Sequence, residues 1–199
     1  MGRRGHTFQV ISLLLIATAA CLGSSASVFS GAQNTAFDLA GHPADPLKSA
    51  GGKIVVLVFV RTDCPVSNRY APIIQRLSAE HADHAAFWLV YPSKSESADA
   101  IRKHERDFGY HLPALRDPQH VLVKESQAQI TPEVAVFDAN RHLVYHGRID
   151  NLYEDIGRAR NAPTTHELED AITAAVAGKT LAVTADATHA VGCYISDLE

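Results

Sequence analysis

Cys64 has the clearest chemical potential in the sequence, because of the segments on either side of it. Residues 54–60, Ile-Val-Val-Leu-Val-Phe-Val, predict a strand that is buried on both faces. After a short turn, apolar residues recur at three- and four-residue intervals from Val66 to Leu77, which predicts an amphipathic helix. Cys64 therefore falls at the amino end of a helix, where unpaired N–H groups and the helix dipole stabilise a thiolate. The pattern predicts a nucleophilic thiol.

The neighbours of Cys64 shape this prediction. Pro65 suits the first helical position, because the N–H that it lacks has no partner within the helix there. Pro72 lies deeper in the helix and is expected to kink it. The Asp63 carboxylate is expected to raise the pKa of the thiol and so to oppose the effect of the helix N-terminus, which lowers it. Arg61 either offsets Asp63 or is simply a solvated charge.

The elements that position Cys64 alternate along the chain. The alternation predicts an α/β fold around a parallel or mixed sheet. The expected elements are a candidate edge strand at 35–39, the strand 54–60, the helix 66–77, a strand at 87–90, a helix at 98–108 that ends at Gly109, a short strand and a short helix within 111–129, a hairpin of 134–137 and 143–145, and a last helix that ends at Gly178. Thr164 and Glu167 resemble a capping box that opens this last helix.

The first residues are typical of an export signal. Arg3 and Arg4 precede an apolar run at 10–17 and then small residues, so residues 1–26 are expected to be a signal peptide. Cys21 could instead be a lipidated N-terminus, and an uncleaved helix is a third interpretation. The predicted organisation is a signal peptide at 1–26, a lead-in at 27–52, one domain at 53–178 and a tail at 179–199. Export leads to a periplasmic or secreted location, where disulfides persist.

Several short motifs together resemble a known superfamily. Cys64-Pro65-Val66-Ser67 resembles the thioredoxin-superfamily Cys-x-x-Cys site with Ser67 in place of the second cysteine, and Pro72 resembles the proline of the helix that follows. Ile130-Thr131-Pro132-Glu133-Val134 resembles the cis-proline loop, and Gly147 the glycine after the hairpin. The resemblance covers residues 35–178 and is greatest to bacterial redoxin-domain proteins, in the branch that holds exported thiol-disulfide oxidoreductases and the alkyl hydroperoxide reductase/thiol-specific antioxidant proteins. It implies a thioredoxin-like three-layer α/β fold, with a central mixed sheet flanked by helices and a C-terminal extension.

The resemblance also implies a site. A cis Thr131–Pro132 bond would present the backbone of Thr131 beside Cys64, so that Thr131, Pro132 and Pro65 form a groove for an extended substrate. The alternative is an ordinary trans turn. Ser67 is a candidate hydrogen-bond donor to the Cys64 thiolate. The enzymatic interpretation requires an accessible Cys64 close to Pro132.

A dithiol mechanism needs a second sulfur, because Ser67 cannot resolve a mixed disulfide. Cys193 is the only other cysteine of an exported chain unless Cys21 is retained. We expect Cys64 to attack a substrate disulfide or hydroperoxide and Cys193 to resolve the product as an intramolecular disulfide. A static structural disulfide and an inert thiol are the alternatives for Cys193.

Composition restricts the partners. The chain has 199 residues, 18 basic and 22 acidic, with no basic block, which argues against nucleic acid. The pairs His81/His84 and His142/His146 lack further ligands for a closed zinc site, and no nucleotide or hydrolase motif occurs, so neither a metal nor a cofactor is expected. Tyr70 is interpreted as a core residue.

The function predicted from these features is an exported thiol-disulfide oxidoreductase that acts on a protein or small-molecule thiol or disulfide. Membrane attachment is expected only through a lipidated Cys21. A peroxiredoxin-like thiol peroxidase is one alternative. However, Arg61 stands where that family has Thr or Ser, and Leu57 stands where it has Pro. The other is a non-catalytic thioredoxin-like binding module.

Overall fold

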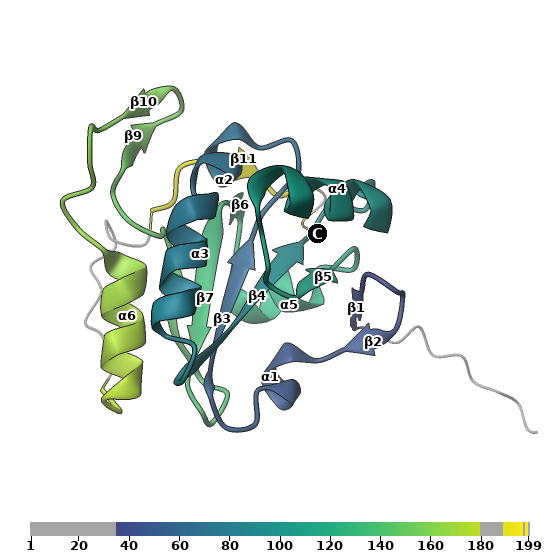
Figure 1. The fold of residues 1–199 in the computed structure, drawn as a ribbon, viewed down its shortest axis with the longest axis horizontal. Helices are drawn as coiled ribbons and strands as arrows, with labels where there is room; N and C mark the ends of the chain where they lie inside the picture. Colours follow the sequence, from purple (N-terminus) through teal and green to yellow (C-terminus); the bar gives the residue numbers. More distant parts are fainter. Residues whose placement is uncertain (1–34, 180–188, 197, 199) are drawn as a thin grey trace, which may run out of the picture. The chain divides into compact units, whose positions relative to one another are not determined.

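A seven-stranded sheet forms the centre of the computed structural model, which describes residues 35–179, 189–196 and 198 (Figure 1). The expected signal peptide, including Cys21, lies outside the described residues. The strands are β1 (Ala36–Asp38), β2 (Pro43–Ala44), β3 (Ile54–Phe59), β4 (Ala85–Tyr91), β5 (Ala114–Arg116), β7 (Glu133–Phe137) and β8 (Leu143–Gly147), in the order β2-β1-β5-β4-β3-β7-β8. The candidate edge strand is β1, which lies between β2 and β5 rather than at the edge.

β3 is buried along its whole length because it has a neighbour on each side. It runs parallel to β4, with Val56 opposite Phe87, and antiparallel to β7, with Leu57 opposite Ala135. The sheet is therefore mixed, and every residue of β3 is buried. Apolar, mostly β-branched residues at both faces explain why this strand has no polar alternation.

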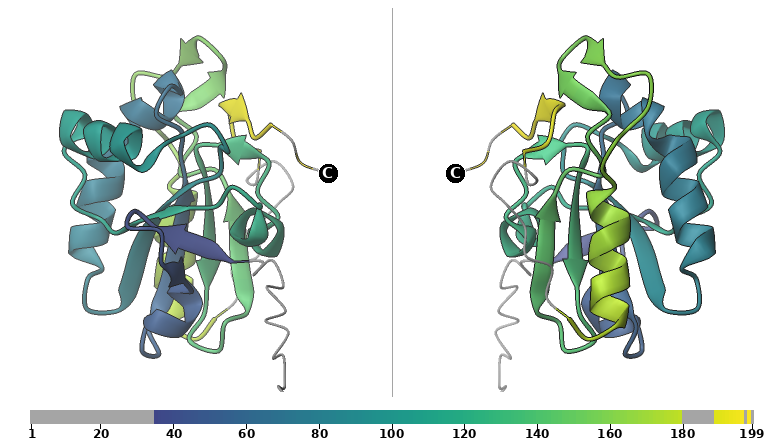
Figure 2. Two further views of the ribbon diagram at one scale, coloured as in Figure 1. Left: turned by 90° about the vertical axis from the view of Figure 1, so that its right-hand side faces the viewer. Right: turned by 90° about the vertical axis from the view of Figure 1, so that its left-hand side faces the viewer.

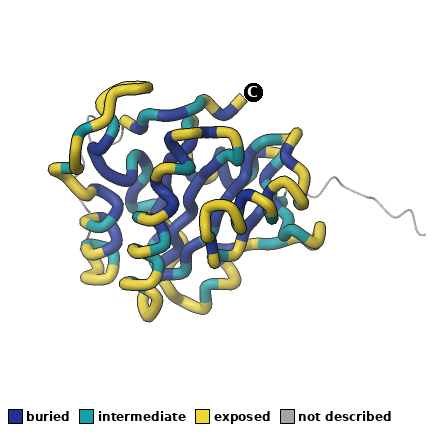
Figure 3. Tube along the Cα trace, turned by 45° about the horizontal axis from the view of Figure 1, so that its top comes forward, coloured by how far each residue is buried: buried dark blue, intermediate teal, exposed yellow. Residues whose placement is uncertain are grey.

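Helices cover both faces of the sheet. They are α1 (Pro46–Ser49), α2 (Pro65–Arg69), α3 (Ala71–Glu80), α4 (Ala98–Phe108), α5 (Val121–Ser126) and α6 (Glu167–Val176). Val56 and Val58 point to the side of α3, α4 and α6, whereas Val55 and Leu57 point to the side of α1 and α5. Figure 2 shows the sheet edge-on between these two groups of helices, and in Figure 3 the buried residues lie along the central strands. The architecture is thus the expected α/β fold with three layers.

Two local expectations were wrong. The helix expected at 66–77 is broken rather than kinked: α2 ends at Tyr70, and Pro72 lies in the first turn of α3. A proline is tolerated there because the first N–H groups of a helix have no partner within it. The capping box is absent, because α6 begins after His166 without a side-chain cap, and the Glu167 carboxylate accepts hydrogen bonds from Thr165 and Arg148 instead.

Two small two-stranded sheets lie beside the carboxyl end of β3. One is a hairpin of β9 (Tyr153–Asp155) and β10 (Arg158–Ala159). The other joins β6 (Ile130–Thr131) to β11 (Cys193–Tyr194), a strand of the C-terminal tail. Among the described residues no helix has the length and apolar character needed to cross a membrane.

Candidate active site

Cys64 lies just beyond β3 and forms the N-cap of α2. Its backbone is extended, with φ −88° and ψ 109°, and Pro65 follows as the first residue of the helix. The Cys64 side chain makes no capping hydrogen bond to the helix, so its sulfur is available for other contacts. The sequence prediction for Cys64 and Pro65 at the helix start is confirmed.

Thr131 is brought to Cys64 by the strand before β7. The Thr131–Pro132 peptide bond is cis, as predicted. The Cys64 thiol donates a hydrogen bond to the Thr131 carbonyl oxygen at 3.1 Å, although the two residues are 67 positions apart. Cys64 is thus held against the residue that precedes Pro132.

Cys193 reaches the same place from the tail. Strand β11 pairs with β6 in antiparallel register, with Cys193 opposite Thr131 and Tyr194 opposite Ile130. The Thr131 hydroxyl donates to the Cys193 carbonyl oxygen at 3.2 Å. Both cysteines are free thiols in this structure.

The two thiols influence each other's ionisation. Burial raises the pKa of Cys64, but the neighbouring Cys193 thiol, Ser67 and the Cys193 backbone lower it, and the net pKa lies below the usual value. Burial and the neighbouring Cys64 thiol with its charge raise the pKa of Cys193 to about 11. Of the two thiols, Cys64 therefore ionises at the lower pH.

Ser67 lies one helical turn after Cys64. Its side chain is fully buried, and its hydroxyl has no hydrogen-bond partner among the described residues. The hydroxyl and the backbone N–H of Ser67 both lower the pKa of Cys64. This arrangement matches the role of a donor to the thiolate.

Asp63 and Arg61 form an ion pair at the front of the loop. The guanidinium lies 2.9 Å from the Asp63 carboxylate, so Arg61 offsets the carboxylate, one of the two alternatives left open by the sequence. The same guanidinium contacts the Tyr194 carbonyl oxygen at 3.5 Å. Despite Asp63, the net pKa of Cys64 is lowered rather than raised.

A buried polar chain, which the sequence analysis missed, supports the loop before Cys64. The Glu96 carboxylate accepts the Thr62 N–H at 2.6 Å, and the Asn68 amide donates to the Thr62 carbonyl oxygen. Burial lowers the pKa of His104, so its imidazole is neutral. Its Nε2 donates to the Asn68 side-chain oxygen, and its Nδ1 accepts from the Tyr91 hydroxyl.

The sequence showed only that these residues are polar. Their contacts could not be predicted, because they depend on the packing of β4 and α4 beside α2.

An apolar cavity of about 300 Å³ opens beside the cysteines. It is lined by Pro65, Val66, Tyr153, Ile156, Gly157, Gly192 and Cys193. Ile156, at the tip of the β9–β10 hairpin, is 70% exposed. Cys193 therefore borders an apolar cavity that is open to solvent.

One expectation about the site needs correction. Cys64 is close to Thr131 as the enzymatic interpretation requires, but its side chain is fully buried rather than accessible. Cys193 packs against the cluster that contains Cys64, and β11 lies along the edge of β6. The cover over Cys64 is therefore partly the chain's own tail.

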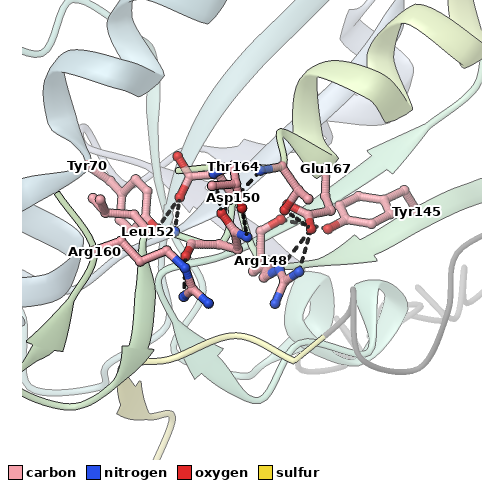
Figure 4. Close-up of polar contacts among 10 residues, drawn as sticks. Tyr70, Tyr145, Arg148, Asp150, Leu152, Arg160, Thr164 and Glu167 are labelled. Carbon is pink, nitrogen blue, oxygen red and sulfur yellow. Dashed lines mark hydrogen bonds and ion pairs between the residues drawn. The ribbon is translucent and has the colours of Figure 1, made fainter. Parts of the chain in front are cut away.

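Tyr70 belongs to the core rather than to the thiol site (Figure 4). Its hydroxyl donates to the Asp150 carboxylate at 2.6 Å, and the same carboxylate oxygen accepts the Leu152 N–H. Arg148 and Glu167 form an ion pair in this region, with Glu167 buried and Arg148 half-buried. These contacts fasten the break between α2 and α3 to the segment after β8.

The described residues contain no group of three or more His, Cys, Asp or Glu side chains placed to hold a metal ion. His142 instead contacts Asp138 at 3.3 Å, and His146 contacts Glu133 at 3.4 Å.

Comparison with known proteins identifies the fold. Residues 51–143 match a family model described as thioredoxin-like. A hypothetical protein from Sinorhizobium meliloti 1021 superposes with a TM-score of 0.67 and 22% identity over 80% of this chain and 87% of that chain. An uncharacterized conserved protein from Geobacillus kaustophilus superposes with a TM-score of 0.67 and 20% identity over 82% of this chain and 89% of that chain.

A third structure has a functional description. It is a secreted disulfide oxidoreductase from Mycobacterium tuberculosis, homologous to E. coli DsbE, with a TM-score of 0.50 and 22% identity over 72% of this chain and 94% of that chain. Comparison with curated protein sequences found no significant match. The chain thus has the α/β thioredoxin-like fold, with distant similarity to thiol-disulfide oxidoreductases.

Proposed function

We propose that the protein is an exported thiol-disulfide oxidoreductase in which Cys64 is the nucleophile and Cys193 the resolving thiol. The observation that carries the proposal is that both cysteines meet at Thr131, whose carbonyl oxygen accepts the Cys64 thiol at 3.1 Å and which lies opposite Cys193 in the β6–β11 pair, with the pKa of Cys64 lowered and that of Cys193 raised. The nucleophile in thiol exchange is the thiolate, so the lower pKa selects Cys64 for the attack. Export is supported by the N-terminal sequence and by the secreted M. tuberculosis relative.

The proposed reaction has two exchange steps. The Cys64 thiolate attacks one sulfur of a substrate disulfide, forms a mixed disulfide and releases the other substrate sulfur as a thiolate. Cys193 loses its proton and attacks the Cys64 sulfur, which forms the Cys64–Cys193 disulfide and releases the second substrate thiolate. The substrate gains two electrons, the protein loses two, and an external dithiol resets the protein.

Four other residues have roles in this proposal. Ser67 donates to the Cys64 thiolate, while Thr131 and Pro132 border the position of the substrate, with Pro65 on the opposite side at the start of α2. The substrate is a protein or small-molecule disulfide. The membrane is involved only if Cys21 carries a lipid.

Oxidation by glutathione disulfide tests the proposal. In a Cys21→Ser background, the reduced protein is expected to release two glutathione thiols per chain and to acquire a Cys64–Cys193 linkage, read by peptide mass mapping. Cys193→Ser is expected to stop at Cys64 bound to glutathione with one thiol released, and Cys64→Ser to release none.

Two outcomes would contradict it. A wild-type protein that keeps glutathione on Cys64 and never links Cys193 removes Cys193 from the mechanism. Oxidation of Cys64 to a sulfenic acid by micromolar hydroperoxide, with no exchange with disulfides, would replace the proposal by a thiol peroxidase.

A further inference from the structure

We propose that strand β11 occupies the substrate's place on β6, and that Cys64 becomes reactive when β11 leaves and an extended, disulfide-bearing polypeptide segment pairs there instead. This inference rests on the proposed function and adds the regulation of the site. It explains how a nucleophile that must reach its substrate can be fully buried, as Cys64 is.

The contacts of β11 are those that an extended peptide would make. Cys193 lies opposite Thr131 in antiparallel register, and the Ile195 N–H donates to the Gln129 carbonyl oxygen at 2.9 Å. These bonds use backbone groups of the strand before Pro132, and backbone pairing requires an extended chain rather than a small thiol. The strand also places a cysteine at Cys64, as a disulfide-bearing substrate must. One edge cannot pair with both strands at once.

Gly192 sets how closely the tail can approach. A Cβ atom at this position would lie 2.0 Å from the Thr131 carbonyl oxygen and 2.7 Å from its carbonyl carbon. Both atoms belong to the backbone, so they cannot move aside as a flexible side chain could. Any larger residue at 192 would therefore push β11 off β6.

The attachment of the tail is local and small. β11 has two residues, Tyr194 is 75% exposed, and Arg61 reaches the tail at 3.5 Å. Ile195 is the main apolar anchor, because its side chain is buried with the cluster that contains Leu57 and Phe59. A segment with so few contacts can open without unfolding of the domain.

The exchange gives an order of events. β11 leaves, the substrate segment pairs with β6, and Cys64 attacks the substrate disulfide. Ser67, which also lowers the pKa of Cys64, stays beside the thiol when Cys193 has left. When the first substrate thiolate has been released, the tail returns and brings Cys193 to the mixed disulfide. The strand that protects Cys64 is thus also the strand that completes the reaction.

Alkylation of Cys64 in the full chain tests the inference. In a Cys21→Ser, Cys193→Ser background, Cys64 is the only thiol, and its rate of reaction with a bulky maleimide is compared with and without Gly192→Val. We expect Gly192→Val to raise the rate by about tenfold or more, since a shift of 1.4 kcal/mol in the opening equilibrium is tenfold. Ser196→Val introduces the same side chain at an exposed tail position and is expected to leave the rate unchanged.

A second variant distinguishes release of the tail from misfolding of the Gly192→Val protein. Ile195→Ala removes the buried anchor without placing any atom near Thr131, and it is also expected to raise the rate of alkylation. Equal rates in the background, Gly192→Val and Ile195→Ala proteins, with native circular dichroism in at least one of the two variants, would overturn the inference.

The two proposals fail differently. If Gly192→Val exposes Cys64 but neither this chain nor the wild type exchanges with a peptide disulfide, the proposed function is wrong and the tail is only a cover. If the wild type exchanges with a peptide disulfide and Gly192→Val does not alter access to Cys64, the function stands and the role of the tail is wrong.

Discussion

Cys193 lies opposite Thr131 across the β6–β11 pair, and the Thr131 carbonyl oxygen also accepts the hydrogen bond of Cys64. Thr131 therefore binds the Cys64 thiol, from the start of a helix, and the Cys193 backbone, from the C-terminal tail.

Ser67→Ala is expected to raise the pKa of Cys64, because a hydroxyl that stabilises the thiolate is removed. The rate of Cys64 alkylation by iodoacetamide at pH 7 should fall by roughly three- to tenfold, which corresponds to a net loss of about 0.7–1.4 kcal/mol for one hydrogen bond. A pH titration of the rate measures the effect. Ser78→Ala, on α3 and away from the site, is the control, and an unchanged titration in Ser67→Ala would refute the role of the hydroxyl.

Cys64→Ser is expected to lower the pKa of Cys193. Burial and the Asp63 charge still raise the pKa of Cys193, but the contribution of the Cys64 thiol and its charge is lost. Alkylation of Cys193 at pH 8 should become roughly tenfold faster or more, because the thiolate fraction rises tenfold for each unit by which the pKa falls. Peptide mass mapping of iodoacetamide adducts reads the rate. If Cys193 is alkylated as slowly in this variant as in the Ser78→Ala control, the two thiols are not coupled.

Glu96→Gln is expected to stabilise the protein at neutral pH. Burial raises the pKa of Glu96, so the folded state holds its proton more tightly than the unfolded state. Stability is therefore complete below the ordinary carboxyl pKa and is lost as the pH rises through the raised value. The glutamine can still accept the Thr62 N–H and carries no charge, so its unfolding midpoint at pH 7 should exceed that of the wild type by about 2–4 °C.

Thermal unfolding at pH 4 and pH 7 checks this result. The difference between Glu96→Gln and the wild type should shrink at pH 4, where the carboxyl is protonated. Glu80→Gln, an exposed member of a pair with Arg76, should not reproduce the pattern. A Glu96→Gln protein that is less stable than the wild type at pH 7 would mean that the charge is needed.

Tyr70→Phe is expected to destabilise the fold by about 1–3 kcal/mol, because the buried Asp150 carboxylate loses a hydrogen bond and nothing replaces it. Urea unfolding measures the change, and alkylation of Cys64 should be unaffected because Tyr70 does not touch the thiol. Tyr153→Phe is a matched control, since its ring packs 5.9 Å from that of Tyr70 and its hydroxyl makes no hydrogen bond with the described residues. A loss of Cys64 reactivity without a loss of stability would instead assign Tyr70 to the site.

Local patterns in the sequence were enough for most of the elements. The apolar run of β3, the Gly109 end of α4 and the hairpin of β7 and β8 were all predicted, because each depends on residues close together in the chain. The break at Tyr70 was not, since a proline in the first turn of a new helix and a proline that kinks one helix look alike in sequence. The start of α6 was misread because Thr164 and Glu167 have tertiary partners, Asn151 and Arg148, that compete with local capping.

The sequence by itself determined the chemical types at the site: one cysteine at a helix start, a serine one turn later, a proline loop and a distant second cysteine. Only the tertiary structure decided that Cys193 lies opposite Thr131, that the pKa of Cys64 is lowered while that of Cys193 is raised, and that the tail covers Cys64. The physical reason is the distance along the chain between the residues that make each contact. Helix starts and turns follow from neighbouring residues, whereas the pairing of β11 with β6 and the desolvation of the thiols depend on contacts between segments more than 60 residues apart.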